Sequence, residues 1–415
     1  MNSYATPIVP DTSIDDLKAL FTCQKAASNA NPYPSYEERC GNVEKLLKLT
    51  EKHKHDICNV IDKDFGNRSV RETTLSDLFL VIQGAKHARR HLRKWMRPRR
   101  VGTSLHSLPA TCKVVPQPLG VIGNIAPWNY PYAIALLPAV HALAAGNRMM
   151  IKPSEVTVHT TELLGNLVSD NFDEDLLAVV TGGAELGNAF AELPFDHLIF
   201  TGSTAVGRKI AQAAAPNLTP VTLELGGKSP AIIDHSYNPA KAVSSILRGK
   251  VLNCGQTCIG VDYVFVPTEK LDGFVGDMKK GFTKFFPNLD GNVDYTTIVS
   301  DRHYDRLRNL VTDARDKGAK VVTVNPDGGE GNTNNRILPL NIVINPSDDM
   351  AVMQEEVFGP VLSIKTYDSL DEVTGYINSH DRPLALYWFG HDRAREKHML
   401  QNTWAGGMCV NETLF

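Results

Sequence analysis

The sequence lacks an excess of charge of either sign. Its 43 Lys and Arg residues nearly balance its 46 Asp and Glu residues, which leaves a formal net charge of −3 across 415 residues. A chain so close to neutral has no overall field that would draw it to nucleic acid or anionic lipid. We therefore expect no nucleic-acid partner and no charge-driven attachment to a membrane.

A long apolar run is also missing. The most apolar window, Pro131–Ala145, is interrupted by Pro138 and His141, and it is too short to span a bilayer. The N-terminal residues MNSYATPIVPDTSIDDL have no basic start followed by an apolar core, which a secretory signal requires. The sequence therefore predicts a cytoplasmic protein without a membrane span.

The cysteines favour neither disulfides nor zinc. There are seven Cys, an odd number, with no C-x-x-C pair, and the 13 His form no zinc pattern with them. We expect free thiols in a reducing compartment and no metal site. His87 and His91 share a helix face by their spacing, and we interpret them as ordinary histidines because such spacing is a weak metal signal.

The first hundred residues predict helices. Ser35 followed by Glu38 is typical of a capping box, and a later helix runs from about Thr74 until Pro98 stops it. The end of that helix, HARRHLRKWMRPRR, is strongly basic. A solvated helix end or a subunit contact is the interpretation we favour, because the chain as a whole is not basic, and a nucleic-acid patch is the alternative.

From Leu119 onward, short apolar runs alternate with helical stretches. This alternation predicts an α/β fold, in which parallel sheets are covered by helices on both faces. The pattern restarts near Gly226, so we predict one domain over residues 1–225 and a second over residues 226–415. The predicted strands are 119–126, 148–152, 176–180, 197–201, 221–225, 230–234, 261–266, 320–324, 341–344, 361–365 and 385–389.

A glycine-rich segment, GSTAVG, runs from Gly202 to Gly207 between a predicted strand and a predicted helix. Such a turn presents free backbone N–H groups and a positive dipole end, which suit a phosphate or pyrophosphate. The segment is neither the G-x-G-x-x-G fingerprint nor a P-loop, so we reject a P-loop hydrolase. A tight turn without a ligand is an equal alternative.

Lys152 and Glu155 lie in the segment KPSE, at the end of the predicted strand 148–152. Nucleotides bind at the carboxyl ends of parallel strands. A Lys can donate to ribose hydroxyls, and a Glu can accept from them and disfavour a 2′-phosphate. The pair therefore favours NAD as cofactor, with NADP possible, and plain surface charge is the alternative.

Three further turns offer reactive groups. PWNYP carries the amide of Asn129, LELGGKS carries the carboxylate of Glu224, and NCGQTC ends on the thiol of Cys258. Flanking Gly, Gln and Thr are poor core material and favour a loop, although Cys254 and Cys258 as small packing residues are the alternative. A nucleophile, a base and an oxyanion donor are the set that an acyl-forming site needs.

Seven segments together resemble the aldehyde dehydrogenase superfamily over about Val114 to Asn411. In chain order they are PWNYP, AAGN, KPSE, FTGSTAVG, LELGGKSP, NCGQTC and EEVFGP. The class 3 branch is more similar still, through TPVTLELGGKSP, GQTC and RPLALYWF. Within that branch, DFGNRS and PFDHLIFTG resemble bacterial coniferyl aldehyde dehydrogenases.

The resemblance implies two Rossmann-like domains and an NAD(P)-dependent oxidation of an aldehyde to the acid. The first domain, 1–225, would bind NAD(P) and carry a bridging hairpin near 101–118, and the second, 226–415, would be catalytic. The aldehyde would be coniferyl or another aromatic or medium-chain aldehyde. The reaction would pass through a thiohemiacetal and a thioester on Cys258.

The resemblance also assigns roles residue by residue. Cys258 is the nucleophile, its backbone N–H and the Asn129 side chain hold the oxyanion, and Glu224 activates the hydrolytic water. Cys254 is set aside as a packing residue, with a reversible disulfide under oxidation as the alternative. Cofactor binding falls to Lys152, Glu155, Gly202, Ser203, Glu356, Phe358 and Trp128, with Glu356 on the nicotinamide ribose and Phe358 beside the ring.

The main departure from the family pattern is at the C-terminus. Relatives continue beyond the position of Asn411 with a segment that completes the substrate funnel and adds a strand to the partner's sheet, whereas this chain stops at Phe415. We therefore expect a homodimer by resemblance but with that segment missing. The alternative function is a family member that binds nucleotide with little or no turnover.

Overall fold

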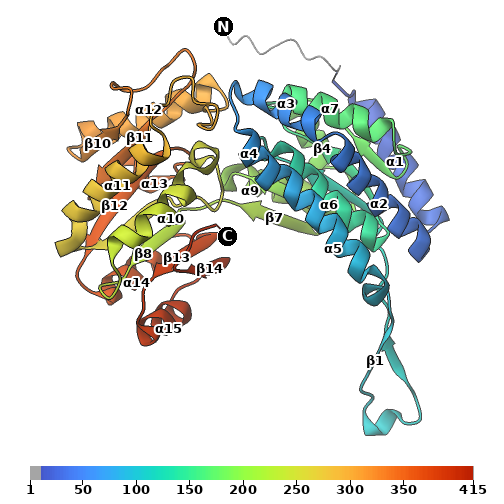
Figure 1. Cartoon of the computed structure of the whole chain (residues 1–415). Helices are drawn as coiled ribbons and strands as arrows, with labels where there is room; N and C mark the ends of the chain where they lie inside the picture. The colour runs from blue at the N-terminus through green and yellow to red at the C-terminus, as the bar shows by residue number, and fades with distance from the viewer. Residues whose placement is uncertain (1–10, 415) are drawn as a thin grey trace. The chain divides into compact units, whose positions relative to one another are not determined.

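The computed structural model of the chain describes residues 11–414 and divides into two compact units. The first unit comprises Met1–Asp64 and Val70–Glu224, and the second comprises Phe65–Ser69 and Leu225–Phe415. Figure 1 shows each unit as a sheet with helices packed on it. The expectation about an export signal falls partly on Met1–Pro10, which lie outside the described residues.

The first unit is built on a five-stranded sheet in the order β5-β4-β3-β6-β7. Its central strand β3 pairs in parallel with both β4 and β6, and β4 pairs in parallel with β5. The predicted strands are confirmed here to within two residues at each end. Their bounds are Val121–Ile125 (β3), Arg148–Lys152 (β4), Leu177–Val179 (β5), His197–Gly202 (β6) and Val221–Leu225 (β7).

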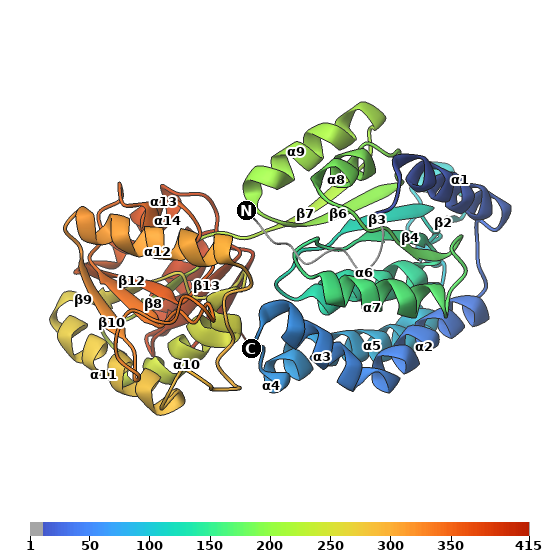
Figure 2. The same cartoon turned by 90° about the horizontal axis from the view of Figure 1, so that it is seen from above.

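Helices cover both faces of this sheet. On one face lie α1 (Ile14–Ala30), α8 (Ala184–Ala191) and α9 (Thr204–Ala214), and on the other lie α6 (Pro131–Ala145) and α7 (Val158–Ser169). Figure 2 shows a further layer beyond α6, formed by α2 (Tyr36–Lys52), α3 (Lys54–Phe65) and α5 (Phe79–Trp95). Because α6 is covered on both sides, it is apolar nearly all round, and ten of its side chains are buried.

The predicted capping box is confirmed at the start of α2. The Ser35 side chain accepts from the Glu38 backbone N–H, and the Glu38 carboxylate accepts from the Ser35 backbone N–H. The helix predicted from Thr74 begins with a π-helical turn, Thr74–Leu78, that follows the short α4 (Val70–Thr73) and leads into α5. The helical region therefore begins at Val70, four residues before the predicted start, and ends at Trp95, ahead of Pro98 as predicted.

The basic end of α5 carries contacts typical of a solvated helix surface. Arg93 lies over the Tyr36 ring, 4.4 Å from its centroid, and Arg89 pairs with Glu44. The His87 and His91 rings lie 4.2 Å apart. Among residues 11–414, no group of three or more His, Cys, Asp or Glu side chains is arranged to hold a metal ion.

A two-stranded ribbon extends from the first unit after α5 (Figure 1). It consists of β1 (Arg99–Val101) and β2 (Cys112–Val114), paired antiparallel, in the stretch where the sequence predicts the bridging hairpin. Every residue of both strands is exposed. A ribbon so short and so exposed has no core of its own.

The second unit is built on a seven-stranded sheet in the order β10-β11-β12-β9-β8-β13-β14. All its neighbouring strands are parallel except β10, an edge strand that runs antiparallel to β11. The strand bounds are Pro230–Ile233 (β8), Tyr263–Pro267 (β9), Lys320–Val324 (β10), Leu340–Ile344 (β11), Val361–Tyr367 (β12), Ala385–Phe389 (β13) and Gly407–Val410 (β14). The α/β fold class is thus confirmed, with one antiparallel edge.

Helices α10 (Pro239–Val251) and α11 (Leu271–Phe285) pack on one face of this sheet, and α12 (Asp301–Asp316) and α14 (Leu370–Asn378) on the other (Figure 2). Two more helices, α13 (Ala351–Gln354) and α15 (Arg393–Asn402), complete the unit. Helices α12, α14 and α15 and strand β14 were absent from the predicted elements. No helix in the described part of the chain is both long enough and apolar enough to cross a membrane.

We predict that Asp64→Ala destabilises the first unit. The Asp64 carboxylate accepts from the backbone N–H groups of His159 (2.9 Å) and Thr160 (2.8 Å) and from the Thr160 hydroxyl (2.6 Å), and so caps α7 from a distant helix. Loss of a cap of this kind costs about 1–2 kcal/mol. Urea unfolding followed by circular dichroism measures the change.

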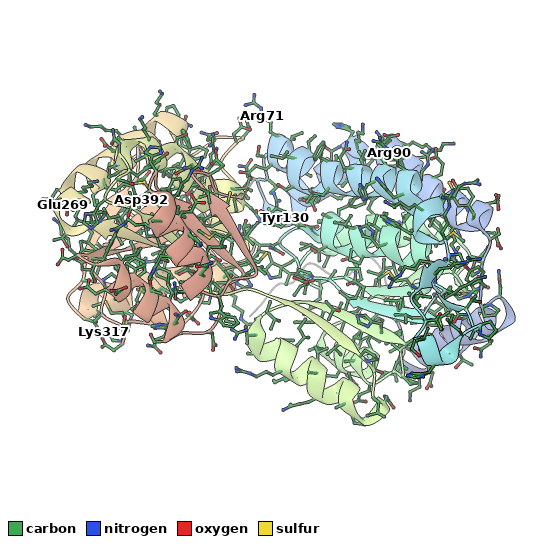
Figure 3. All side chains as sticks on the ribbon, turned by 90° about the horizontal axis from the view of Figure 1, so that it is seen from below. Arg71, Arg90, Tyr130, Glu269, Lys317 and Asp392 are labelled. Carbon is green, nitrogen blue, oxygen red and sulfur yellow. The ribbon has the colours of Figure 1, made fainter. Side chains whose placement is uncertain are left out.

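The matched control is Asp392→Ala, because Asp392 caps α15 at an exposed position in the other unit (Figure 3). Equal losses of stability in the two variants would show that burial and the third hydrogen bond add nothing at Asp64.

Candidate functional site

The loop that carries Cys258 begins where α10 ends and has an unusual backbone. Asn253, Cys254 and Gly255 all have positive φ, at 52°, 51° and 76°. For residues other than Gly this conformation costs roughly 1–2 kcal/mol each. The loop therefore requires contacts elsewhere in the second unit to hold it.

The side chain of Gln256, which is fully buried, supplies those contacts. Its Nε2 donates to the carbonyl oxygens of Asn253 (3.0 Å) and Thr297 (3.1 Å), and its Oε1 accepts from the Val299 backbone N–H (3.0 Å). The Asn253 amide in turn donates to the Gln256 carbonyl at 3.1 Å. The Gln256 amide group thus bonds both to Asn253 within the turn and to residues 297–299 outside it.

The two cysteines of this loop differ in accessibility. Cys254 is fully buried, and its Sγ lies 3.6 Å from the Tyr295 hydroxyl, which donates to the Leu338 carbonyl. Cys258 is only half-buried. Of the two thiols, Cys258 is therefore the one that a reagent can reach, as a nucleophile must be.

The segment EEVFGP packs against the Cys258 loop. A Cβ on Gly255 would stand 2.4 Å from the Gly359 carbonyl oxygen, so only glycine permits this approach. Phe358 itself has a positive φ of 50°. On the other side, a Cβ on Gly226 would stand 2.1 Å from the Glu356 carboxylate. The second unit therefore brings together the LGGKSP part of one predicted segment, from Leu225 onward, with NCGQTC and EEVFGP, whereas Glu224 belongs to the first unit.

A cluster of charged side chains holds the Glu355–Pro360 loop. Asp262 is buried, pairs with Lys228 and accepts from the Val357 backbone N–H at 2.9 Å. Lys228 also donates to the Val352 and Glu355 carbonyls. Arg306 also contacts this loop: it bonds to the Glu355 carboxylate and donates to the Val357 carbonyl at 2.5 Å.

Two members of this region have strongly shifted pKa values. Burial raises the pKa of Glu356 to about 8, and repulsion from Asp262 raises it further. The Gly227 N–H, Lys228 and Arg306 lower this pKa but do not outweigh burial. Burial lowers the pKa of Lys250 to about 8, although Asp262 favours its charged form. Perturbed groups of this kind are typical of functional sites.

Sequence reasoning missed this supporting cluster. Lys228 lies inside a segment that the sequence analysis singled out, yet nothing there assigns it a role, and Asp262 and Arg306 belong to no quoted segment. Lys250 lies eight residues before Cys258, in α10. A lone charge in an apolar run, as at Asp262 in the segment GVDYVF, is the only signal that could have drawn attention to them.

In the first unit, Lys152 and Glu155 lie together as predicted. Lys152 ends β4, is nearly fully buried, and donates to the Pro153 carbonyl (3.1 Å) and the Glu155 carboxylate (2.9 Å). Burial alone would raise the pKa of Glu155, but attraction and a hydrogen bond from Lys152 outweigh it and lower that pKa. The pair offers an ammonium and a carboxylate at the end of a parallel strand, a donor set that fits ribose hydroxyls.

Gly202 and Ser203 lie where β6 ends and α9 begins. A Cβ on Gly202 would stand 2.6 Å from the Phe200 ring, so the turn needs glycine. Ser203 is the N-cap of α9, and its hydroxyl accepts from the Val206 N–H at 3.4 Å. The remaining N–H groups of the first turn are suited to a phosphate.

Trp128 and Asn129 lie in the turn between β3 and α6, just before Tyr130, which Figure 3 labels. Asn129 is buried and Trp128 half-buried. Asp77 fixes the start of α6 by accepting from the Tyr132 (3.2 Å) and Ala133 (3.0 Å) backbone N–H groups. Glu224, by contrast, is an exposed residue of β7.

Comparison with known proteins identifies relatives over nearly the whole chain. A sequence profile described as the aldehyde dehydrogenase family matches residues 8–415. A probable coniferyl aldehyde dehydrogenase of Pseudomonas aeruginosa is 46% identical over 401 residues, which are 97% of this chain and 83% of that protein. A coniferyl aldehyde dehydrogenase of a Pseudomonas species is 42% identical, over 95% of this chain and 82% of that protein.

Solved structures with a similar fold also cover nearly the whole chain. The substrate-bound state of an aldehyde dehydrogenase, AldH, from Staphylococcus aureus aligns with a TM-score of 0.91 at 34% identity, over 96% of this chain and 85% of that one. A Mycobacterium tuberculosis aldehyde dehydrogenase complexed with NAD+ aligns with a TM-score of 0.87 at 25% identity, over 98% and 84%.

We predict that Glu356 makes the stability of the protein fall as pH rises. Its folded pKa of about 8 lies above the ordinary value of 4.5, so the folded state keeps a proton that the unfolded state releases. Stability from this group is present at acidic pH and lost as pH approaches 8. In thermal unfolding, the stability of Glu356→Gln relative to the parent protein should therefore increase between about pH 5 and pH 8.

The neighbouring variant Glu355→Gln serves as the control, since Glu355 is half-exposed and pairs with Arg306. A constant difference between Glu356→Gln and the parent across this pH range would contradict the prediction.

Proposed function

This chain belongs to the aldehyde dehydrogenase family, and we propose that it oxidises its aldehyde through a covalent intermediate on Cys258, with NAD as hydride acceptor. The observation that supports this most is the Cys258 loop itself. A half-buried thiol ends a costly turn that a buried amide holds in place. Structural cysteines need no such arrangement.

In the proposed reaction the Cys258 thiolate adds to the aldehyde carbon and forms a thiohemiacetal. The Asn129 amide and the Cys258 backbone N–H stabilise the oxyanion, and a donor of this kind is worth about 3–4 kcal/mol. A bound nicotinamide would supply the hydride acceptor, and loss of a hydride from this carbon would leave a thioester on Cys258. Glu224 then removes a proton from water, and the hydroxide releases the acid and frees the thiol.

Two pairs of residues in the first unit are proposed to hold the adenosine ribose and the pyrophosphate of the cofactor. Lys152 and Glu155 would bind the adenosine ribose, and Gly202 and Ser203 the pyrophosphate, because a buried ammonium, a carboxylate and a helix N-terminus fit these groups.

Trp128, Glu356 and Phe358 complete the proposed set. Glu356 would accept from the nicotinamide ribose, for which the glycine at 226 leaves its carboxylate room, and Phe358 would pack beside the nicotinamide ring. A relative of known structure was solved with NAD+, which supports a nicotinamide cofactor here.

For the substrate we propose a coniferyl-type aromatic aldehyde. The support is the activity for which two relatives are named, each 42–46% identical to this chain over the aligned residues. Medium-chain aliphatic aldehydes are the alternative substrate class. A homodimer and a cytoplasmic location stay predictions from resemblance and from the sequence.

The direct test is NADH formation, followed by absorbance, with coniferyl aldehyde and a medium-chain aliphatic aldehyde as substrates. Cys258→Ala should lose at least about 10³-fold in kcat, since removal of a catalytic nucleophile costs that much or more. Cys254→Ala is the matched control and should keep turnover of the same order as the parent.

Two outcomes would count against the proposal. If the parent binds NAD yet turns over neither aldehyde above the level of Cys258→Ala, the chain is a nucleotide-binding relative with little activity. If Cys254→Ala is as inactive as Cys258→Ala, the nucleophile is misassigned.

We predict that Glu155→Gln shifts cofactor preference toward NADP. A carboxylate beside the adenosine ribose repels a 2′-phosphate by about 1–2 kcal/mol, so its removal should raise kcat/KM for NADP relative to NAD about tenfold. Steady-state kinetics with both cofactors measure the ratio. Glu192→Gln, an exposed change at the end of α8, is the control, and an unchanged ratio in Glu155→Gln would remove Glu155 from the ribose site.

A further inference from the structure

A five-residue segment, Phe65–Ser69, belongs to the second unit although the residues on both sides of it belong to the first. We call this segment the arm. It makes up most of the motif DFGNRS, to which the proposed function assigns no role. Its hydrogen bonds within the second unit converge on residues 292–299, a stretch that is neither helix nor strand.

Asn67 makes the most extensive contacts of the arm. Its Nδ2 donates to the carbonyl oxygens of Asn292 (3.0 Å) and Tyr295 (2.7 Å), and its own carbonyl accepts from the Thr297 N–H at 3.0 Å. A single residue therefore fixes both ends of a six-residue stretch that has no ladder of its own.

Phe65 and Arg336 complete the attachment. The Phe65 carbonyl accepts from the Thr297 hydroxyl at 2.6 Å and from Arg336 Nη2 at 2.7 Å, and Arg336 Nε donates to the Ile298 carbonyl at 2.7 Å. The Ile298 N–H also donates to the Arg336 carbonyl at 3.1 Å, so the arm holds Thr297 directly and Arg336 links the arm to Ile298.

The opposite side of the same stretch holds the Cys258 loop. The Thr297 carbonyl accepts from Gln256 Nε2 at 3.1 Å, and the Val299 N–H donates to Gln256 Oε1 at 3.0 Å. Thr297 therefore bonds to the arm through its N–H and hydroxyl and to Gln256 through its carbonyl. Cys258 follows Gln256 by two residues.

We propose that the arm positions the Cys258 thiol, with Asn67 and Thr297 as positioning residues that act through Gln256. The inference rests on the proposed function for its catalytic consequence. The physical reason is that the loop 253–256 is unfavourable by itself, so its place depends on where Thr297 and Val299 lie, and the arm sets that place. A displacement of about 1 Å at a reacting group can cost on the order of 100-fold in rate.

The experiment compares Asn67→Ala and Thr297→Val with the parent by the burst of NADH formed in the first turnover with coniferyl aldehyde. Both variants should slow the burst about tenfold or more, while the Kd for NADH, from fluorescence titration, stays within about twofold. Thr297→Ser keeps the hydroxyl that donates to Phe65 and should restore most of the rate. The control Asn378→Ala removes an Asn-to-backbone hydrogen bond in α14 (2.7 Å) and should leave the burst unchanged.

A second readout does not depend on turnover. Cys254 is fully buried in the same loop, so loosening the loop should expose it to iodoacetamide. Peptide mapping should show Cys254 alkylated faster in Asn67→Ala and Thr297→Val than in the parent, Thr297→Ser or Asn378→Ala.

A double-mutant cycle then tests the route. If Asn67 acts through Gln256, the variant Asn67→Ala with Gln256→Ala should be no slower in the burst than Gln256→Ala alone. Independent, multiplying losses would overturn the route, and an unchanged burst with unchanged Cys254 protection in Thr297→Val would overturn the inference. If the parent shows no burst, the proposed function fails, and the Cys254 protection decides the inference without it.

Discussion

The hydrogen bonds of the Gln256 side chain are the interaction on which the site depends most. The turn before Cys258 places three successive residues in the left-handed region, and two of them have side chains. A free peptide would abandon such a turn, because each non-glycine residue there is strained. The buried amide compensates with three hydrogen bonds, two of them to residues 297–299. The accessible thiol is therefore fixed by a residue that never needs to touch the substrate.

Next to this loop, charged side chains of the second unit form hydrogen bonds with the backbone of the Glu355–Pro360 loop. Lys228, Asp262 and Arg306 each bond to a carbonyl or N–H group of the Glu355–Pro360 loop. Their effect is to keep Glu356 in a confined, largely dry position, where burial raises the pKa of its carboxyl. Glycines at 226 and 255 allow the close approach of the three segments, and any Cβ there would collide with Glu356 or Gly359. The close approach at the glycines and the hydrogen bonds from charged side chains thus both stabilise the conformation of the Glu355–Pro360 loop.

The sequence predicts the elements that carry a strong local signal. Buried parallel strands are continuous apolar runs, so β4 and β13 were predicted to the residue. The predicted bounds of β7 and β10 also match, although β7 is only partly buried and β10 is antiparallel. Helix α12 was not predicted, because half of its sequence DRHYDRLRNLVTDARD is charged and its apolar face is narrow, and β14 was missed because it has only four residues, two of them exposed. The antiparallel direction of β10 depends on the long loop before β11, for which apolar patterning carries no information.

The residues of the candidate site likewise fall into those that the sequence predicts and those that it does not. Motifs bring out the residues to which the proposed chemistry assigns roles, such as Cys258 and the Lys152–Glu155 pair, because reactive groups in short turns stand out. They do not bring out Asp262, Arg306 or Thr297, and they include Asn67 only within DFGNRS, with no role, since these side chains make contacts with backbone groups distant in the sequence. Such contacts exist only once the chain has folded. Supporting residues are therefore the part of an active site that a single sequence conceals.

The central claim is that the aldehyde carbon passes through a thioester on Cys258. The most direct measurement is peptide mass spectrometry of Glu224→Gln, quenched in acid after mixing with NAD and coniferyl aldehyde. If Glu224 is the base that activates water, as proposed, the acyl group should accumulate in this variant, and the peptide that contains Cys258 should gain the mass of the coniferyl acyl group. NADH formed in stoichiometric amount with the acyl group on another residue, or with no acylated peptide at all, would contradict the account.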